Sequence, residues 1–293
     1  MLEINCSLAK KLIKEQFPKW TDLPIYPVKE SGNDNRTFRL GEKMSIRLPS
    51  AERYVAQVDK ENKWLPYLAD NLQIPIAQPI AKGIPSQDYP WSWSIMKWIE
   101  GETVSKSRIK NLSRFALELA GFIKALHSID TLDGPIAGEH NFHRGGSLKV
   151  YDEETRKTIE LLKDEFDSST LLKIWGKALK TEWTEKPVWV HGDLEADNIL
   201  VDKDGALCGV IDFGILGVGD PASDLVIAWT FFDKESRNTF QESINLDKNL
   251  WERARGWALW KALISYEKYR KNNPEDASEI EGIINSIVEE FAS

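Results

Sequence analysis

The residues best suited to chemistry lie in one stretch, Val188 to Gly214, which reads VWVHGDLEADNILVDKDGALCGVIDFG. Within it, Asp193, Asn198 and Asp212 offer carboxylate and carboxamide oxygens. These are hard ligands, which suit Mg²⁺ better than zinc or copper. Mg²⁺ held by so few protein groups usually completes its octahedron with phosphate oxygens. The sequence therefore predicts a site for magnesium and a phosphate-bearing ligand.

Three short apolar runs are expected to position these polar residues. Residues 188–190 form the first run, which predicts a strand leading directly into the motif. Residues 199–201 and 206–211 are two more β-rich runs, and the Asp-Lys-Asp-Gly between them has the composition of a tight hairpin turn. Such a hairpin would fold Asn198 back toward Asp212.

The order and spacing of these residues match a known catalytic pattern. His191-x-Asp193-x4-Asn198, followed by the Asp-Phe-Gly triplet that starts at Asp212, corresponds to the catalytic loop and metal-binding triplet of kinases. There, the residue equivalent to Asp193 accepts the hydroxyl proton, and those equivalent to Asn198 and Asp212 hold the metal. A single Asp of this kind would more often be a turn or cap residue. The combination favours phosphoryl transfer, with His191 packed under the loop rather than acting as the base.

Together with Gly219-Asp220-Pro221-x-x-Asp224-Leu225, these motifs resemble the aminoglycoside phosphotransferase family of small-molecule kinases. Protein kinases usually carry Arg where this chain has Gly192, and they have a long activation segment that this chain has no room for. The resemblance runs from about Ser31 to the last helices. Its motifs are specific for the phosphotransfer machinery and not for the acceptor.

The resemblance implies an α+β, two-lobed, protein-kinase-like fold. Residues 1–98 would form a small, β-rich, nucleotide-binding lobe, and residues 99–293 a larger, mainly helical lobe for catalysis and acceptor binding. A helical insert is expected at about 131–184. In this family Asp220 is expected to support the catalytic loop.

The resemblance also implies nucleotide-binding residues in the first hundred positions. Ser31 and Asn33 lie ahead of a predicted hairpin strand, where the phosphates would be covered. Arg47 stands where kinases place a Lys that contacts the α and β phosphates, and Arg keeps the charge in a bulkier form. Met96 and Trp98 fall at the hinge, where backbone groups would bind the nucleobase.

Glu61 is the expected partner of Arg47, because it lies within the apolar stripe of a predicted helix. That stripe consists of Tyr54, Val58, Leu65 and Leu68. A carboxylate in such surroundings requires a cation, and Arg47 on the neighbouring strand is the natural one. The alternative is that Glu61 turns outward beside two neighbouring lysines.

The remaining pattern predicts helices before and after the motif. Helices are expected at 2–17, 112–129, 151–166, 169–183, 221–232, 251–270 and 276–291, and strands at 26–28, 37–40, 44–48 and 92–99. The Gly-rich segment from Thr131 to Gly146 is expected to be a surface loop. Aromatic residues of the 251–270 helix are expected to belong to the core rather than to a sugar-stacking wall.

The net charge of the chain limits the kinds of partner that it is expected to bind. Its 293 residues carry a net charge of −8, and no basic patch is available for nucleic acid. Residues 1–100 hold 14 Lys and Arg against 12 Asp and Glu, or +2, whereas the rest holds 24 against 34, or −10. Because acidic clefts concentrate cations, this asymmetry favours a cationic acceptor, although an acidic surface could serve solubility alone.

The N-terminal residues contain no long apolar run, so neither a signal peptide nor a membrane span is expected. Cys6 and Cys208 have neither metal spacing nor a disulfide framework. A cytoplasmic location, without membrane or nucleic-acid partners, and a monomer or weak dimer are therefore expected.

We expect an enzyme that moves the γ-phosphate of ATP or GTP, with Mg²⁺, to a hydroxyl of a small, cationic molecule such as an aminoglycoside antibiotic. Asp193 is the predicted catalytic residue. Glu195 and Asp197 are either contacts for acceptor ammonium groups or solvated loop acids. The alternatives are a metabolic or macrolide kinase of the same fold and, in another class, a nucleotide-binding pseudokinase.

Overall fold

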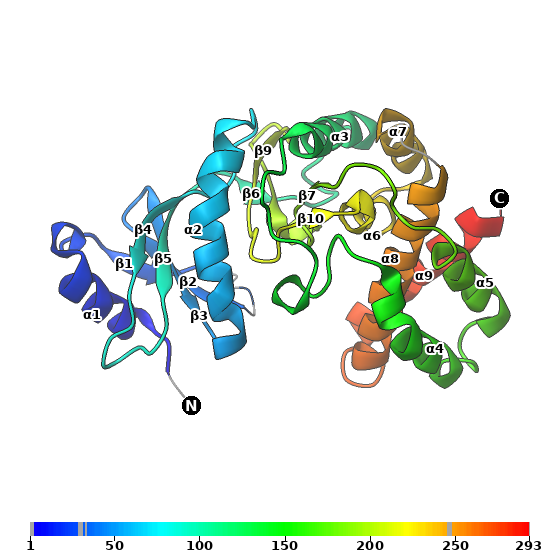
Figure 1. The fold of residues 1–293 in the computed structure, drawn as a ribbon, viewed down its shortest axis with the longest axis horizontal. Helices are drawn as coiled ribbons and strands as arrows, with labels where there is room; N and C mark the ends of the chain where they lie inside the picture. Colours follow the sequence, from blue (N-terminus) through cyan, green and yellow to red (C-terminus); the bar gives the residue numbers. More distant parts are fainter. Residues whose placement is uncertain (1–2, 29–31, 33, 245–247, 293) are drawn as a thin grey trace.

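The computed structural model describes residues 3–28, 32, 34–244 and 248–292, which form two parts (Figure 1). The N-terminal part, from α1 to β5, is built on a sheet, and the C-terminal part, from β6 to α9, is mainly helical. The predicted α+β class with a small β-rich part and a larger helical part is confirmed. The lobe boundary at 98/99 and the limits of the insert stay predictions.

The sheet of the N-terminal part has five antiparallel strands in the order β1-β2-β3-β5-β4. They are β1 (Ile25–Pro27), β2 (Asn35–Leu40), β3 (Met44–Pro49), β4 (Pro79–Gly83) and β5 (Trp93–Lys97). The strands predicted from the sequence agree with these to within a few residues. Arg47 lies on β3, the central strand, opposite Thr37 of β2 and Ser94 of β5.

Two helices pack against this sheet. α1 (Cys6–Gln16) begins at Asn5, whose side chain accepts hydrogen bonds from two backbone N–H groups of the first turn. Its buried residues join β-strand residues in a small core that belongs to the N-terminal part. α2 (Val55–Asp70) runs along the side of the sheet that faces the C-terminal part (Figure 1), and its Trp64, Leu65 and Leu68 enter the larger core.

The C-terminal part is a set of helices around that larger core. They are α3 (Leu112–Ser128), α4 (Asp152–Leu161), α5 (Ser168–Ala178), α6 (Ile227–Thr230), α7 (Lys234–Ile244), α8 (Lys248–Tyr269) and α9 (Pro274–Ala292). Short 3₁₀ turns occur in both parts. Those of the N-terminal part are η1 (Pro18–Trp20) and η2 (Glu52–Tyr54), and those of the C-terminal part are η3 (Glu139–Asn141), η4 (Leu148–Tyr151), η5 (Ala196–Asn198) and η6 (Pro221–Leu225). Helix α8 packs against α4, α5, α9 and η6, so residues on several of its faces are buried.

Two small sheets of the C-terminal part hold the predicted motif. β7 (Val188–Val190) pairs with β10 (Gly217–Gly219), and β6 (Glu102–Thr103) pairs with β8 (Ile199–Val201), which pairs with β9 (Leu207–Val210). The three strands predicted around the motif are confirmed. The loop from residue 191 to 198, which we call the catalytic loop, therefore joins β7 to β8, and Asp212 follows β9.

Two predictions differ from the structure in detail. The helix expected at 221–232 is η6 followed by the one-turn helix α6, because η6 turns the Asp224 side chain inward toward the catalytic loop. The segment from Thr131 to Gly146 is not simply a surface loop, since it buries Asn141 and Arg144. The side chains of these two residues donate to carbonyl oxygens of Arg144 and Gly192, inside the C-terminal part.

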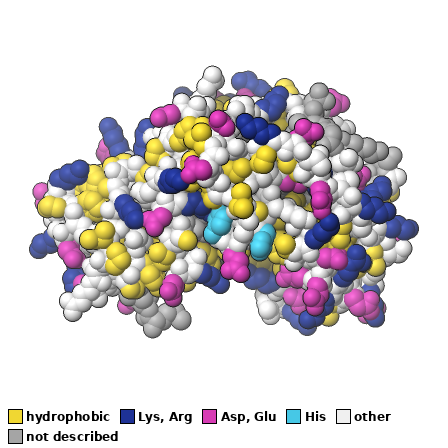
Figure 2. Space-filling view, in the orientation of Figure 1, with side chains coloured by type: hydrophobic (Ala, Val, Ile, Leu, Met, Phe, Trp, Pro, Cys, Tyr) yellow, Lys and Arg dark blue, Asp and Glu magenta, His cyan; other side chains and the backbone are white. Residues whose placement is uncertain are grey.

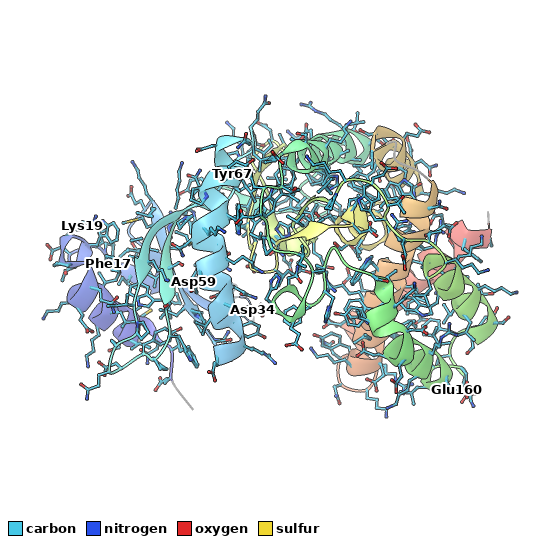
Figure 3. The ribbon with its side chains drawn as sticks, viewed as in Figure 1. Phe17, Lys19, Asp34, Asp59, Tyr67 and Glu160 are labelled. Atoms are coloured by element: carbon cyan, nitrogen blue, oxygen red, sulfur yellow. The ribbon has the colours of Figure 1, made fainter. Side chains whose placement is uncertain are left out.

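Side chains from α2 connect the two parts. At one end of α2, the Tyr67 hydroxyl donates to the carbonyl oxygen of Asp130 at 3.0 Å (Figure 3). Further along the helix, the Lys60 ammonium lies 3.1 Å from Nδ1 of His140. None of the helices in the described ranges combines the length and the apolar character needed to cross a membrane.

Candidate active site

The catalytic loop is held from below by a buried carboxylate. Asp224 accepts hydrogen bonds from the backbone N–H groups of His191 and Gly192, each at 2.7 Å. Gly192 has a φ of +88°, and a Cβ at this position would lie 2.7 Å from the carbonyl oxygen of Ile215. A side chain here would therefore clash with the backbone, which explains the Gly where protein kinases carry Arg.

The role expected for Asp220 belongs to Asp224. Asp220 instead caps η6 through the N–H of Ala222 and forms a buried ion pair with Arg253 at 2.6 Å. Because Asp224 lies one turn further along η6, its side chain reaches back to the loop. The sequence contained Asp224 in the same motif, but spacing alone did not distinguish the two carboxylates.

His191 packs under the loop, as predicted. Its ring is buried against Phe213, with centroids 4.4 Å apart. Nδ1 accepts the N–H of Asp193 at 3.2 Å, which assigns the ring proton to Nε2, 2.9 Å from the carbonyl oxygen of Ile211. Both ring nitrogens are thus used to fix the loop.

Asp193 lies in an ion pair that the sequence did not predict. The ammonium of Lys261, on α8, lies 2.9 Å from Oδ1 of Asp193 and 2.7 Å from Oε1 of Glu195. Burial would raise the pKa of the Asp193 carboxyl, but the Lys261 ammonium holds it below its ordinary value. Asp193 is therefore ionised at neutral pH. We call these three residues the Lys261 cluster.

The sequence offered no signal for Lys261. It follows Asp193 by 68 positions and stands on a helix that the sequence assigned to packing. Burial would lower the pKa of Lys261, but the carboxylates of Glu195 and Asp193 raise it above its ordinary value. The ammonium therefore stays charged despite its partial burial.

The β8–β9 hairpin brings Asn198 and Asp212 to the same edge, as the turn residues predict. The N–H of Ile211 donates to the carbonyl oxygen of Asn198 at 2.9 Å. Nδ2 of Asn198 donates to the carbonyl oxygen of Asp193 at 2.9 Å, which leaves the amide oxygen as its candidate metal ligand. Asp212 has a φ of +62°, a strained conformation for a residue other than Gly, and such strain gathers at functional sites.

These oxygens fit magnesium in type and number. Nowhere in the described part of the chain do three or more His, Cys, Asp or Glu residues gather as a metal cage. Mg²⁺ is commonly held by one or two carboxylates, with phosphates and water filling the other positions. The amide oxygen of Asn198 and the carboxylate of Asp212 match that pattern.

Arg47, on β3, connects the N-terminal sheet to Asp212 at the end of the β8–β9 hairpin. Its predicted pairing with Glu61 is confirmed. Its Nη1 lies 2.7 Å from Oε1 of Glu61, and its Nη2 lies 2.5 Å from Oδ1 of Asp212. The side chains of Arg47 and Glu61 are 11% and 4% exposed. Burial would lower the pKa of Arg47, but the two carboxylates raise it, so the charge is retained. We call these residues the Arg47 cluster.

Gly32, one of the described residues between β1 and β2, lies close to Asp212. Ser31 and Asn33, the predicted phosphate-covering residues, lie outside the described residues. A Cβ placed on Gly32, between them, would lie 3.9 Å from Oδ2 of Asp212. Asp34 lies between α2 and the C-terminal part (Figure 3) and accepts from Nε2 of Gln57 at 3.0 Å. Gly32 is thus adjacent to the predicted metal ligand.

At the predicted hinge, Met96 and Trp98 differ. Met96 is buried on β5 opposite Ser45. The N–H of Trp98 donates to the carbonyl oxygen of Lys43 at 2.8 Å, and its ring centre lies 3.9 Å from the Arg39 guanidinium carbon. The backbone donor and the ring of Trp98 are thus engaged within the protein, and nucleobase contacts by either residue stay predictions.

A small pocket opens beside Asp193. It is lined by Arg144, Gly192, Asp193, Leu194, Glu195, Ser223, Val226, Trp257, Trp260 and Lys261. The free space measures about 10 Å³, enough for about one water molecule. The Arg144 guanidinium lies 4.8 Å from the ring centres of Trp257 and Trp260, and its Nε donates to the carbonyl oxygen of Gly192 at 3.0 Å. Arg144 thus joins the pocket wall to the catalytic loop.

Comparison with known proteins agrees with this geometry. A model of the phosphotransferase enzyme family matches residues 28–258. An aminoglycoside 3'-phosphotransferase of Acinetobacter baumannii is 26% identical over 198 residues, which cover 66% of this chain and 71% of that protein. YcbJ, an uncharacterised protein of Bacillus subtilis, is 24% identical over 226 residues, or 70% of this chain and 69% of that protein.

Solved structures share the fold. A GDP complex of an aminoglycoside 2'-phosphotransferase-IIIa mutant superposes with a TM-score of 0.75 at 18% identity, covering 98% of this chain and 99% of that one. A macrolide 2'-phosphotransferase type I gives 0.63 at 18% identity, with 94% of each chain covered. The fold and site define a kinase-like enzyme that phosphorylates small molecules. Since the family model spans more than half of its length, the chain belongs to the phosphotransferase enzyme family.

Proposed function

We propose that this enzyme transfers the γ-phosphate of ATP or GTP to a hydroxyl of an aminoglycoside-like small molecule. The observation that carries the proposal is the contact between Asp193 and Asn198 at the open end of the β8–β9 hairpin, where Asp212 also lies. A general base and two metal ligands are the groups that phosphoryl transfer requires. Solved relatives of the same fold include complexes with GDP and with ATP.

In this proposal Asp193 orients the acceptor hydroxyl and accepts its proton. The hydroxyl oxygen bonds to the γ-phosphorus as the bond to the β–γ bridging oxygen breaks, and the nucleoside diphosphate leaves. Asn198 and Asp212 would hold Mg²⁺, which when bound offsets the negative charge of the phosphates. Arg47, positioned by Glu61, binds the phosphates.

The remaining nucleotide contacts follow the family pattern. Ser31 and Asn33 would cover the phosphates, and Met96 and Trp98 would lie near the nucleobase. The engaged N–H of Trp98 makes its backbone carbonyl the available group on that residue. The choice between ATP and GTP belongs to the same proposal.

Two features support a cationic acceptor such as an aminoglycoside. Several relatives are aminoglycoside phosphotransferases, and one related structure holds kanamycin. The first turn of α4 carries Asp152, Glu153 and Glu154, and Figure 2 shows acidic side chains at the lower right of the molecule, where α4 lies. A macrolide is the second candidate, because a macrolide phosphotransferase shares the fold and the pocket beside Asp193 has Trp257 and Trp260 in its wall.

Replacement of the proposed base tests the function. With aminoglycosides, macrolides and sugars as acceptors, Asp193→Asn should lower kcat by about 10²- to 10⁴-fold, because general-base catalysis contributes that much. Asp204→Asn, an exposed change in the β8–β9 turn, should leave kcat unchanged. Equal phosphotransfer by wild type and Asp193→Asn would refute the catalytic role of Asp193. Absence of phosphotransfer by wild type to every acceptor would instead favour the pseudokinase interpretation.

The cellular location, the oligomeric state and the biological role of this enzyme are also proposals. We propose a cytoplasmic enzyme, a monomer or weak dimer, with no nucleic-acid or membrane partner and with a role in antibiotic resistance. The two cysteines are both free, which is compatible with a reducing compartment.

A further inference from the structure

In the Lys261 cluster, a lysine of the protein itself lies between two carboxylates of the catalytic loop. Glu195 is one of two loop acids, with Asp197, that the sequence assigns either to contact with an acceptor ammonium or to solvation. In the structure, Glu195 and Asp193 already share an ammonium, that of Lys261, at 2.7 and 2.9 Å. An ammonium has three donor hydrogens, and two of them are directed at these carboxylates.

The space around this ammonium is nearly filled. The pocket has room for about one water molecule, and Lys261 forms part of its lining. The side chains of Lys261, Asp193 and Glu195 are 31%, 37% and 33% exposed, so the ion pairs face the mouth of the pocket. An acceptor that brings its hydroxyl to Asp193 must therefore approach Lys261 closely.

A second group in the pocket indicates what such an acceptor offers. Ser223 is only 4% exposed and lines the same pocket, and its hydroxyl has no hydrogen-bond partner among the described residues. A buried hydroxyl without a partner is costly, and a water molecule or a ligand hydroxyl can satisfy it. The pocket thus combines a fixed cation with an unsatisfied neutral hydroxyl.

We propose that Lys261 is a specificity-determining residue that occupies the ammonium position between Asp193 and Glu195, so that the enzyme selects acceptors whose reacting hydroxyl is flanked by uncharged hydroxyl groups. This inference rests on the proposed phosphotransfer at Asp193. An acceptor ammonium beside the reacting hydroxyl would meet Lys261 at short range and be repelled. Amines elsewhere on the acceptor remain compatible, since Glu154 of α4, which accepts from Nε1 of the pocket-lining Trp260 at 3.0 Å, offers a further carboxylate beside the pocket.

The first experiment tests the ammonium position without catalysis. Lys261→Ala should leave a space between two carboxylates that n-propylammonium can fill. Thermal unfolding with propylammonium chloride, against equal sodium chloride, should then show a saturable rise in Tm of about 2 °C or more. Wild type and Lys268→Ala, which removes an exposed lysine of the same helix, should show no such rise. An equal response of all three proteins would overturn the proposal.

The second experiment measures acceptor choice. The probes are the methyl glycosides of glucose and glucosamine. They differ at one position, where glucose carries a hydroxyl and glucosamine an ammonium, and other hydroxyls flank that position in both. Wild type should favour the neutral sugar by about 10- to 100-fold in kcat/KM, and Lys261→Met should narrow that ratio to about threefold or less. A ratio unchanged in Lys261→Met, or a wild type that favours the amine, would overturn the inference.

The two experiments separate failure of this inference from failure of the proposed function. Absence of phosphotransfer by wild type to either sugar and to the wider panel would contradict the proposed function, while the propylammonium experiment would still decide the Lys261 position. Phosphotransfer lost in Asp193→Asn, together with an unaltered sugar ratio in Lys261→Met, would support the function and reject the inference. If Lys261→Ala fails to fold, Lys261→Gln provides the same charge removal with retained volume.

Discussion

The Arg47 and Lys261 clusters share one design, a cation between two carboxylates, but they differ in burial and in origin. Arg47 is 11% exposed and joins Glu61 of α2 to Asp212, whereas Lys261 is 31% exposed and joins two acids of one loop. Arg presents a rigid fork suited to phosphate, and Lys presents a compact charge on a flexible chain. The Arg47 cluster is thus part of the packing of the fold, whereas the Lys261 cluster is more open to solvent.

Lys60 shows how the pKa of a partly buried cation depends on contact with carboxylates. It is also partly buried, but its close contacts are Nδ1 of His140 at 3.1 Å and the carbonyl oxygen of His140 at 3.3 Å. Burial lowers its pKa to about 8, and the nearby charge of Glu61 offsets only part of that effect. Lys60 therefore holds its proton less firmly than Lys261, whose ammonium contacts two carboxylates.

The largest effect on stability is expected from breaking the Arg47 cluster. Arg47→Met leaves Glu61 buried without a cation, and removing one partner of a buried ion pair costs about 3–5 kcal/mol. Urea unfolding followed by fluorescence measures this loss. Arg47→Lys is the matched control and should recover a substantial part of the stability. A loss below about 1 kcal/mol in Arg47→Met would show that the cluster is not part of the structural core.

A smaller loss is expected from removing the support under the catalytic loop. Asp224→Ala leaves the buried N–H groups of His191 and Gly192 without their acceptor, at a cost of about 1–3 kcal/mol for each unpaired group. It also removes a buried carboxylate, and recovery of that desolvation cost offsets part of the loss. Misplacement of the loop should also lower kcat by about 100-fold. Asp220→Ala breaks a different buried pair, with Arg253, and should reduce stability while affecting kcat less. An unchanged kcat in folded Asp224→Ala would contradict the supporting role.

The Lys261 cluster should contribute little to stability. Lys261→Met removes ion pairs whose members are about one-third exposed, so solvent screening limits the expected loss to about 1 kcal/mol or less. Comparing its urea midpoint with that of Arg47→Met tests the contrast between the clusters directly. Equal losses for the two variants would mean that both sides of the site are structural.

The smallest effect concerns the pH dependence of Lys60. Between about pH 8 and pH 10.5, the unfolded chain keeps a proton on Lys60 that the folded chain has released. Its contribution to the free energy of unfolding therefore rises with pH across this window. Lys60→Met should lack that rise, as judged by urea unfolding at pH 7.5 and pH 10. Lys63→Met, on an exposed position of α2, should keep the wild-type profile, and parallel profiles for Lys60→Met and wild type would contradict the shifted pKa.

The sequence predicted those features of the site that follow from local sequence patterns. The hairpin between β8 and β9 follows from its turn residues, and the pairing of Arg47 with Glu61 follows from one carboxylate in an apolar helical stripe. Each conclusion needed only strand and helix periodicity and the cost of an unpaired buried charge. The spacing of His191, Asp193 and Asn198 supplied the class of chemistry.

Tertiary structure alone decided which distant groups complete the site. Lys261 reaches Asp193 from α8, Arg144 reaches Gly192 from a loop expected at the surface, and Asp224 supports the loop in place of Asp220. A lysine on a helix has no local signal for the carboxylates it will meet, because that contact depends on how the helix packs. For this reason the sequence determined the phosphotransfer motifs, and the packing of α8 decided which side chain lies next to Asp193.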